Sequence, residues 1–169
     1  TPTVMAWFAA FGSKNDTDPS GARVVVLGAG GAARSVIEAL GRAGAADVVV
    51  VNRTQARAES AAALAGPVGR VGSVDAIGEA DIVINATSVG MDGVSSPSPV
   101  GSFAASQTVV DLIYRPLSTP WLTAARDVGA NAVNGVGMLL HQAAVQLELW
   151  TGIDAPIDAM RDSVADVIG

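Results

Sequence analysis

A glycine-rich turn is the first stretch of this sequence whose residue types suggest chemistry. Gly28–Ala33 (GAGGAA) follows the apolar run Val24–Leu27 and precedes a helical pattern in which Val36, Ile37 and Leu40 recur at helix spacing. Glycines in such a turn let the backbone approach an anion, and the helix N-terminus offers it unpaired N–H groups. The pattern G-x-G-x-x-[GA] between a strand and a helix therefore predicts a turn that binds the pyrophosphate of a dinucleotide. The residues assigned to it are Gly28, Ala29, Gly30, Gly31 and Ala32.

The tip of the second predicted strand indicates which dinucleotide this is. An acidic residue about 20 residues past the glycines usually holds the adenosine ribose. Here the segment Asn52–Arg57 (NRTQAR) contains no carboxylate and two arginines, Arg53 and Arg57. With Thr54 as the helix N-cap, Arg57 is the third helical residue, and both guanidiniums lie where they can grip a 2′-phosphate. We therefore expect NADP rather than NAD; the alternative is that both arginines are solvated surface charges.

The elements that must position these groups alternate between short apolar strands and helices. Strands are predicted over Val24–Leu27, Asp47–Val51, Val68–Val71, Asp81–Ala86, Thr108–Ile113 and Asn131–Val133. Helices are predicted after the glycine turn, from Thr54 to about Leu64, briefly after Ser73, from the Thr119–Pro120 cap to about Val128, over Gly135–Trp150, and from Pro156 to about Val167. This alternation predicts the α/β class: a doubly wound parallel sheet of about six strands, the Rossmann fold, with helices on both faces.

We expect residues 21–169 to form this dinucleotide-binding domain. Residues 1–20 are interpreted as the end of an upstream helix, with Val4, Trp7, Phe8 and Phe11 on one face, followed by a linker. The Gly-, Ser- and Pro-rich segment Gly90–Ser102 is predicted to be a mobile loop.

Composition narrows the class of partner. The chain has 169 residues, enough for one domain with its own core. Its formal net charge of −6 argues against nonspecific binding to nucleic acid. No apolar run approaches the roughly 18 residues of a membrane span, and there is no cysteine for disulfides or thiolate–metal sites. We expect a cytoplasmic protein with a small-molecule substrate, no nucleic-acid or membrane partner, and no metal, because the carboxylates are scattered.

Five motifs, in the same order along the chain, resemble the C-terminal NADP-binding domain of shikimate dehydrogenase. They are GAGGA (Gly28–Ala32), NRTxxRA (Asn52–Ala58), NATSVGM (Asn85–Met91), DLIYRPLSTP (Asp111–Pro120) and GVGMLLHQA (Gly135–Ala143). The last two are the specific ones, because the first two also occur in glutamyl-tRNA reductase. The resemblance implies an NADP-dependent oxidoreductase that reversibly reduces 3-dehydroshikimate to shikimate in aromatic amino-acid biosynthesis.

The resemblance also implies roles for individual residues. Cofactor contacts are carried over to the glycine turn and to Asn52, Arg53, Thr54, Arg57, Thr87, Ser88, Leu112, Gly135 and Met138, and substrate contacts to Tyr114 and Gln142. Helix spacing agrees in part, since Gly135, Met138 and Gln142 fall on one helical face. Plainer alternatives stay open: Met138 as core, Gln142 as a packing residue and Tyr114 as a loop anchor.

No catalytic residue is assigned to this chain. The family's catalytic lysine and its paired aspartate belong to an N-terminal substrate domain that these residues do not resemble. The one lysine, Lys14, and the neighbouring Asp16 and Asp18 fall in the linker and are not given that role. We expect the chain alone to bind NADP with little turnover, since general acid–base assistance is worth about 10²–10⁴-fold in rate. The alternatives are a non-catalytic, standalone NADP-binding module and a related dehydrogenase that uses quinate.

Apolar residues near both ends of the chain predict self-association, because exposed apolar patches favour it. They are Trp7, Phe8, Phe11, Trp150, Ile157, Met160, Val164 and Ile168.

Overall fold

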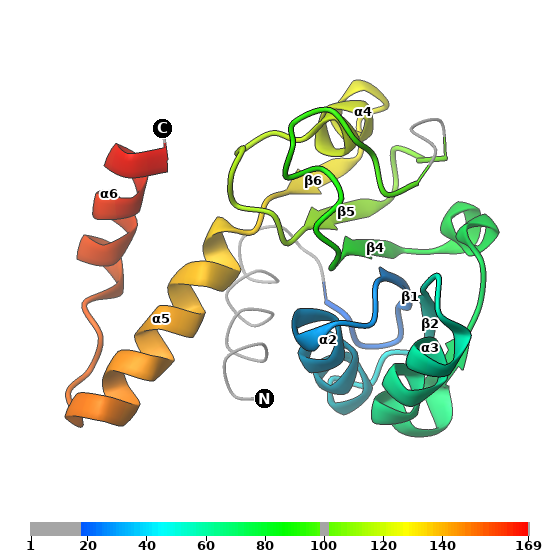
Figure 1. Ribbon diagram of the computed structural model, residues 1–169, viewed down its shortest axis with the longest axis horizontal. Coiled ribbons are helices and arrows are strands. Elements are labelled where there is room, and N and C mark those ends of the chain that lie inside the picture. The colour runs from blue at the N-terminus through cyan, green and yellow to red at the C-terminus, as the bar shows by residue number, and fades with distance from the viewer. Residues whose placement is uncertain (1–17, 99–101, 169) are drawn as a thin grey trace.

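Six parallel strands form one sheet at the centre of the molecule (Figure 1). The computed structural model describes residues 18–98 and 102–168. The strands are β1 (Arg23–Leu27), β2 (Asp47–Val51), β3 (Gly69–Val71), β4 (Ile82–Asn85), β5 (Thr108–Asp111) and β6 (Asn131–Val133). Their order across the sheet is β3-β2-β1-β4-β5-β6, and every neighbouring pair is parallel. This is the strand order of the Rossmann fold, so the predicted class is confirmed.

The helices begin and end close to the predicted positions. They are α2 (Gly31–Arg42), α3 (Gln55–Ala62), α4 (Pro120–Asp127), α5 (Val136–Thr151) and α6 (Ile157–Ile168), with the 3₁₀ segments η1 (Ala63–Val68) and η2 (Val74–Glu79). Ser73 and Thr119 cap η2 and α4 with their hydroxyl groups, as predicted. The helix expected to reach about Leu64 ends at Ala62, and the chain continues as η1, which is itself kinked at Gly66 (φ 65°). The predicted helix over residues 1–11 and most of the linker lie outside the described residues.

The strands are buried on both faces of the sheet, as their apolar runs predict. Val24 and Val26 of β1 face the core under α2 and α3, whereas Val25 faces the core under α4. On the second face the Trp121 ring is fully buried and meets Phe103 edge-on, with 5.2 Å between the ring centroids. Two apolar layers therefore clamp the sheet and hold its strand ends in place.

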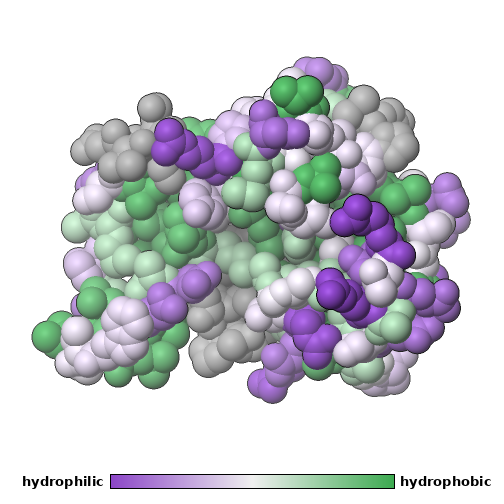
Figure 2. Space-filling view, viewed as in Figure 1, coloured by the Kyte–Doolittle hydropathy of each residue, from purple (hydrophilic) through white to green (hydrophobic). Residues whose placement is uncertain are grey.

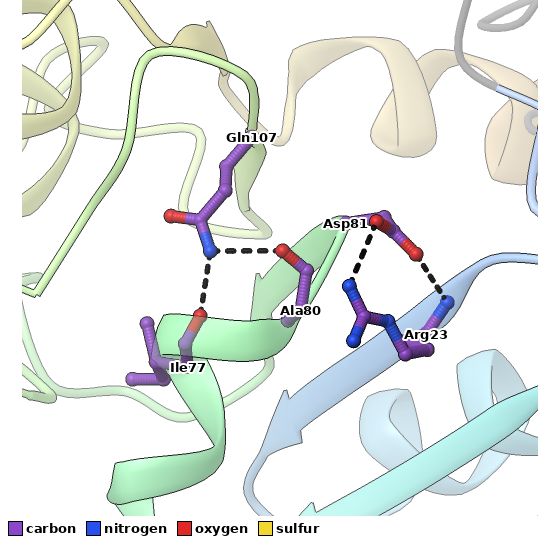
Figure 3. A network of polar contacts seen from close by, with 5 residues as sticks. All are labelled: Arg23, Ile77, Ala80, Asp81 and Gln107. Atoms are coloured by element: carbon purple, nitrogen blue, oxygen red, sulfur yellow. Dashed lines mark hydrogen bonds and ion pairs between the residues drawn. The ribbon is translucent and has the colours of Figure 1, made fainter.

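Polar side chains join the segments at the amino-terminal ends of the central strands β1, β4 and β5 (Figure 3). Gln107, just before β5, is 2% exposed and donates from Nε2 to the carbonyl oxygens of Ile77 (2.6 Å) and Ala80 (2.9 Å). Asp81, just before β4, accepts from the Arg23 N–H group (2.8 Å) and lies 3.5 Å from the Arg23 guanidinium. These contacts hold the amino-terminal ends of β1, β4 and β5 side by side. Because the three strands are parallel, their carboxyl-terminal ends also lie together at one edge of the sheet.

The last two helices, α5 and α6, extend away from the sheet as a pair (Figure 1). Large apolar side chains are exposed where α5 ends: Leu149 (78%), Trp150 (80%) and Ile153 (70%). Figure 2 shows hydrophobic surface at the lower left, where Figure 1 places this end of α5. Among the described residues, no helix combines the length and apolar character needed to cross a membrane.

Candidate functional site

Gly28 ends β1 at the edge of the sheet where all six strands finish. Its φ is +111°, and a Cβ there would lie 2.9 Å from the Ala86 carbonyl oxygen. Its N–H group donates to the Val51 carbonyl (2.8 Å), which holds the turn beside β2. Both the backbone conformation and the close approach require glycine at this position.

The N-terminus of α2 lies directly after this turn and is open. Gly30 is the N-cap, no side chain caps the helix, and the first turn contains no acidic residue. The first intrahelical bond runs from the Arg34 N–H to the Gly30 carbonyl (2.9 Å), so the preceding N–H groups have no helical partner. A Cβ at Gly30 or Gly31 would meet no atom within 4 Å. Free N–H groups facing open space suit a pyrophosphate.

The β2–α3 turn presents two unpaired cations. Thr54 is the N-cap of α3, as predicted, although its hydroxyl makes no capping bond, and Arg57 is the third residue of the helix. The Asn52 side chain donates to the Thr54 carbonyl (3.0 Å) and so shapes the turn. Arg53 and Arg57 are both exposed, and neither guanidinium has a hydrogen bond or ion pair with any described residue. The turn therefore offers two free guanidiniums and a free hydroxyl to an anion.

A cavity of about 860 Å³ opens at the ends of β4 and β5. It brings Thr87, Ser88, Leu112 and Tyr114, four of the predicted contact residues, together with Ala32 of the glycine turn. Tyr114 is 43% exposed. The rest of the lining is formed by Ala86, Met91, Asp92, Gly93, Ile113, Arg115, Pro116 and Leu117.

The predicted contact residues around α5 lie outside this lining. Gly135 is the residue before the helix rather than its first turn, and its N–H donates to the Ile113 carbonyl (3.0 Å). A Cβ at Gly135 would lie 2.0 Å from the Leu112 carbonyl oxygen, so the glycine lets α5 begin against the end of β5. Met138 packs against the core under α2, and Gln142 is exposed. Packing alone therefore explains the glycine at Gly135 and the methionine at Met138.

One cavity wall belongs to the segment expected to be a mobile loop. The described residues of this segment, 90–98 and 102, include a turn organised by Asp92, whose carboxylate accepts from the Val94 N–H (3.0 Å) and from the N–H and hydroxyl of Ser95. These bonds, led by the Ser95 hydroxyl, lower the pKa of Asp92 to about 2. No sequence motif assigned Asp92 to the site. The sequence signal that could have found it is an aspartate two and three residues before the N–H groups of Val94 and Ser95, a spacing typical of an Asx turn.

Two polar residues that sequence reasoning left unassigned end the two strands beneath the cavity. Asn85 and Asp111 are register partners on β4 and β5, and both are fully buried. Asn85 Nδ2 donates to Asp111 Oδ1 (3.0 Å), while Asn85 Oδ1 accepts from both the N–H (3.0 Å) and the hydroxyl (2.7 Å) of Thr87. The sequence signal was a single polar residue closing each apolar strand, IVIN and TVVD.

The Asp111 carboxylate is the centre of this network. Besides Asn85, it accepts from the Ile113 N–H (3.1 Å) and from the Thr119 hydroxyl (2.7 Å). Burial raises the pKa of Asp111, and the hydrogen bonds from Thr119, Ile113 and Asn85 oppose that rise. A buried carboxylate that receives three donors is held in one orientation.

The strand order, the glycine turn and the open N-terminus of α2 together define a Rossmann domain of the dinucleotide-binding type. The chain belongs to the shikimate/quinate 5-dehydrogenase family: that family's model matches residues 12–99, and the model of the shikimate 5′-dehydrogenase C-terminal domain matches residues 135–165. The resemblance seen in the sequence motifs is thereby confirmed.

Individual relatives agree with this assignment. The chain is 43% identical over 164 residues to the shikimate dehydrogenase (NADP(+)) of Moorella thermoacetica, covering 90% of this chain and 56% of that protein. Among solved structures, shikimate 5-dehydrogenase from Thermus thermophilus in complex with NADP(H) and shikimate superposes with a TM-score of 0.85 at 36% identity, covering 97% of this chain and 62% of that one. Quinate dehydrogenase from Corynebacterium glutamicum in complex with NAD gives 0.85 at 28%, covering 97% and 62%. The chain thus spans little more than half the length of such relatives.

Proposed function

We propose that this chain is the NADP-binding part of a shikimate dehydrogenase, which reversibly reduces 3-dehydroshikimate to shikimate with NADPH. The observation that carries the proposal is the β2–α3 turn beyond the glycine turn. Its two guanidiniums are exposed and pair with no described residue, and the segment Asn52–Arg57 contains no carboxylate. A 2′-phosphate is the feature that separates NADP from NAD, and two arginines can bind it with charge-assisted hydrogen bonds.

The residues present fit the rest of such a cofactor. When bound, NADPH supplies the hydride that reduces the substrate carbonyl. We propose that the N–H groups at the start of α2 hold the pyrophosphate, and that Ser88 and Leu112 border the nicotinamide in the cavity. Tyr114, exposed at the cavity wall, is assigned to the substrate side. Gln142 is also assigned to the substrate, from the family motif, and its exposed position on α5 leaves its amide open to a ligand.

We further propose that the chain alone has little turnover. The ionisable side chains lining the described part of the cavity are Asp92, Tyr114 and Arg115. Asp92 has its pKa lowered to about 2 and its oxygens engaged by Ser95 and Val94, so it is a poor proton donor at neutral pH. Tyr114 is assigned to a substrate contact, and the family's catalytic lysine and aspartate belong to a substrate domain that these residues do not resemble. Steady-state assays of the chain with shikimate and NADP should therefore show weak or no NADPH formation. Robust turnover would contradict this.

Cofactor titrations of arginine variants test the main proposal. Arg53→Ala should weaken NADP binding by about 1.5–3 kcal/mol, the range for hydrogen bonds to charged groups, and leave NAD binding nearly unchanged. Arg161→Ala is the matched control, because it removes the same charge from α6, where Arg161 pairs with Asp158. Equal losses for NADP and NAD, or a wild-type chain that does not bind NADP, would refute the assignment.

Quinate is the second candidate substrate, favoured by the likeness to a solved quinate dehydrogenase. The described cavity does not distinguish the two acids by charge, since they share a carboxylate. Adding shikimate or quinate to the complete protein and comparing kcat/KM separates the two activities. A chain that binds NADP but completes no active enzyme would instead be a standalone NADP-binding module.

We also propose that the isolated chain self-associates and works in the cytoplasm. A mostly apolar groove between α5 and α6 is lined in part by Leu139, Met160 and Val164, and the Trp150 side chain is exposed further along α5. A second copy would cover this surface, and sedimentation over a range of concentrations should show dimers. The cytoplasmic assignment is supported by the lack of cysteine and is tested by fractionation.

A further inference from the structure

The two walls of the cavity are fastened to one buried pair of side chains. The wall after β4 is held by Asn85, which binds Thr87 through two hydrogen bonds and donates to the Val89 carbonyl (3.1 Å). The wall after β5 is held by Asp111, which receives the Ile113 N–H. Because Asn85 and Asp111 bond to each other, one buried side-chain contact joins the two walls, beside the backbone bond from the Leu112 N–H to the Asn85 carbonyl (3.0 Å).

Thr87 takes part in this scaffold more than in ligand binding. Its N–H and its hydroxyl hydrogen both go to Asn85 Oδ1, and its hydroxyl oxygen accepts from the Val89 N–H (3.1 Å). A hydroxyl has one hydrogen, so Thr87 has no donor left for a ligand in the cavity. The family motif assigned Thr87 to the cofactor; in this arrangement its side chain orients the turn that carries Ser88.

The network continues away from the cavity to α4. Thr119 donates its hydroxyl hydrogen to Asp111 Oδ2 and accepts from the Leu122 N–H (3.3 Å) at the start of that helix. Asp111 accepts three hydrogen bonds through its side chain, which suits an ionised carboxylate, because that group can only accept. Among the described residues, every buried side-chain nitrogen and oxygen has a partner, so removing one member leaves another unsatisfied.

We propose that Asp111 is a positioning residue for the nicotinamide end of the site: through Asn85 and Ile113 it holds the turns after β4 and β5 in their orientation at the two cavity walls. The inference rests on the proposed function. It predicts that an Asp111 variant loses binding at the nicotinamide end of NADP and keeps it at the phosphate end, since Arg53 and Arg57 lie in the β2–α3 turn and on α3, outside the network.

Two ligands separate positioning from general loss of structure. Adenosine 2′,5′-bisphosphate carries only the phosphate end, whereas NADP spans both ends. Asp111→Ala is expected to weaken NADP at least tenfold while leaving the bisphosphate within about twofold, because only NADP reaches the β4–β5 walls. Asp111→Asn, which keeps two acceptor lone pairs for Asn85 and Ile113 and can donate to the Thr119 hydroxyl, should restore most of the NADP affinity.

A second pair of variants covers the case in which Asp111→Ala does not fold. Thr119→Val removes one donor from Asp111 at a buried site outside the cavity lining, and should weaken NADP by about three- to tenfold. Ser73→Ala is the control for a lost helix cap, since it removes the cap of η2 at an exposed site outside the network, and should leave both ligands unchanged.

The outcomes point to different failures. If the wild-type chain binds neither ligand, the proposed function falls and the role of Asp111 with it. If the wild type binds both ligands but the Asp111 and Thr119 variants bind NADP as well as it does, or lose both ligands equally, the positioning role alone is overturned.

Discussion

A methyl group added at Gly135 is expected to force α5 away from the end of β5. An ideal Cβ there lies 2.0 Å from the Leu112 carbonyl oxygen and 2.4 Å from its carbonyl carbon. Optimal contact between such atoms is at about 3.5–4.0 Å. The φ of Gly135 is −76°, which alanine adopts freely, so the effect of Gly135→Ala is steric alone.

The size of the effect follows from which atoms collide. Overpacking a well-packed site typically costs about 1–3 kcal/mol, occasionally more. Here the obstructing atoms are backbone and cannot rotate away, so we expect Gly135→Ala to cost at least about 3 kcal/mol. For a domain of this size each kcal/mol lowers Tm by about 2–4 °C, which predicts a fall of about 6–12 °C. Because Leu112 lines the cavity, NADP affinity should fall as well.

Thermal unfolding followed by circular dichroism, together with NADP titration, measures both effects. Gly78→Ala is the matched control: Gly78 lies in η2 with an ordinary φ, and a Cβ there meets nothing within 4 Å. Its stability should stay within about 0.5 kcal/mol of wild type. An unchanged Tm for Gly135→Ala would show that α5 is not seated on β5 as described.

Two further substitutions probe the amino-terminal edge of the sheet. Gln107→Leu leaves two buried carbonyl groups and the Ala104 N–H without their partner and should cost about 2–4 kcal/mol in urea unfolding; a loss below about 1 kcal/mol would contradict the buried network. The Arg23 N–H, aided by its guanidinium, holds the pKa of Asp81 below the ordinary 3.8, so the ionised carboxylate stabilises the fold above that pH and this contribution is lost as pH falls through the folded pKa. Asp81→Asn should therefore be less stable than wild type at neutral pH and approach it in acid, as Tm measured across the pH range will show; a difference independent of pH would refute the linkage.

The sequence predicted those features that depend on neighbours along the chain. Val24–Leu27 reads as a buried strand because four successive apolar residues suit a sheet covered on both faces, and Thr119 reads as a cap because Pro120 follows it. The parallel sheet was reachable from the alternation of strands and helices, since parallel strands require crossover connections, whereas the order β3-β2-β1-β4-β5-β6 comes from the structure.

The features that sequence reasoning missed depend on pairing between distant residues. Asn85 and Asp111 are 26 positions apart, and only the β4–β5 register makes them partners. Asp92 lines the same cavity as residues that follow β5, and no local sequence pattern predicts that these two distant segments lie together. Gly135 was assigned to the cofactor by motif, whereas its contact with Leu112 gives a packing reason for glycine.

The two ends of the proposed site differ in how they are built, and this difference decides what substitutions can do. At the proposed phosphate end, Arg53 and Arg57 are exposed and form no hydrogen bond or ion pair with a described side chain, so replacing them is expected to change binding without disturbing the core. At the proposed nicotinamide end, Asn85 and Asp111 are fully buried, so a substitution that breaks their hydrogen bonds alters both the walls and the stability of the sheet. On the proposed function, preference between NADP and NAD would therefore be set by exposed side chains that can be replaced, whereas the geometry around the reacting ring would be tied to the fold. A carboxylate introduced at Asn52 beside the arginines is, by this argument, a route to NAD preference that leaves the cavity intact.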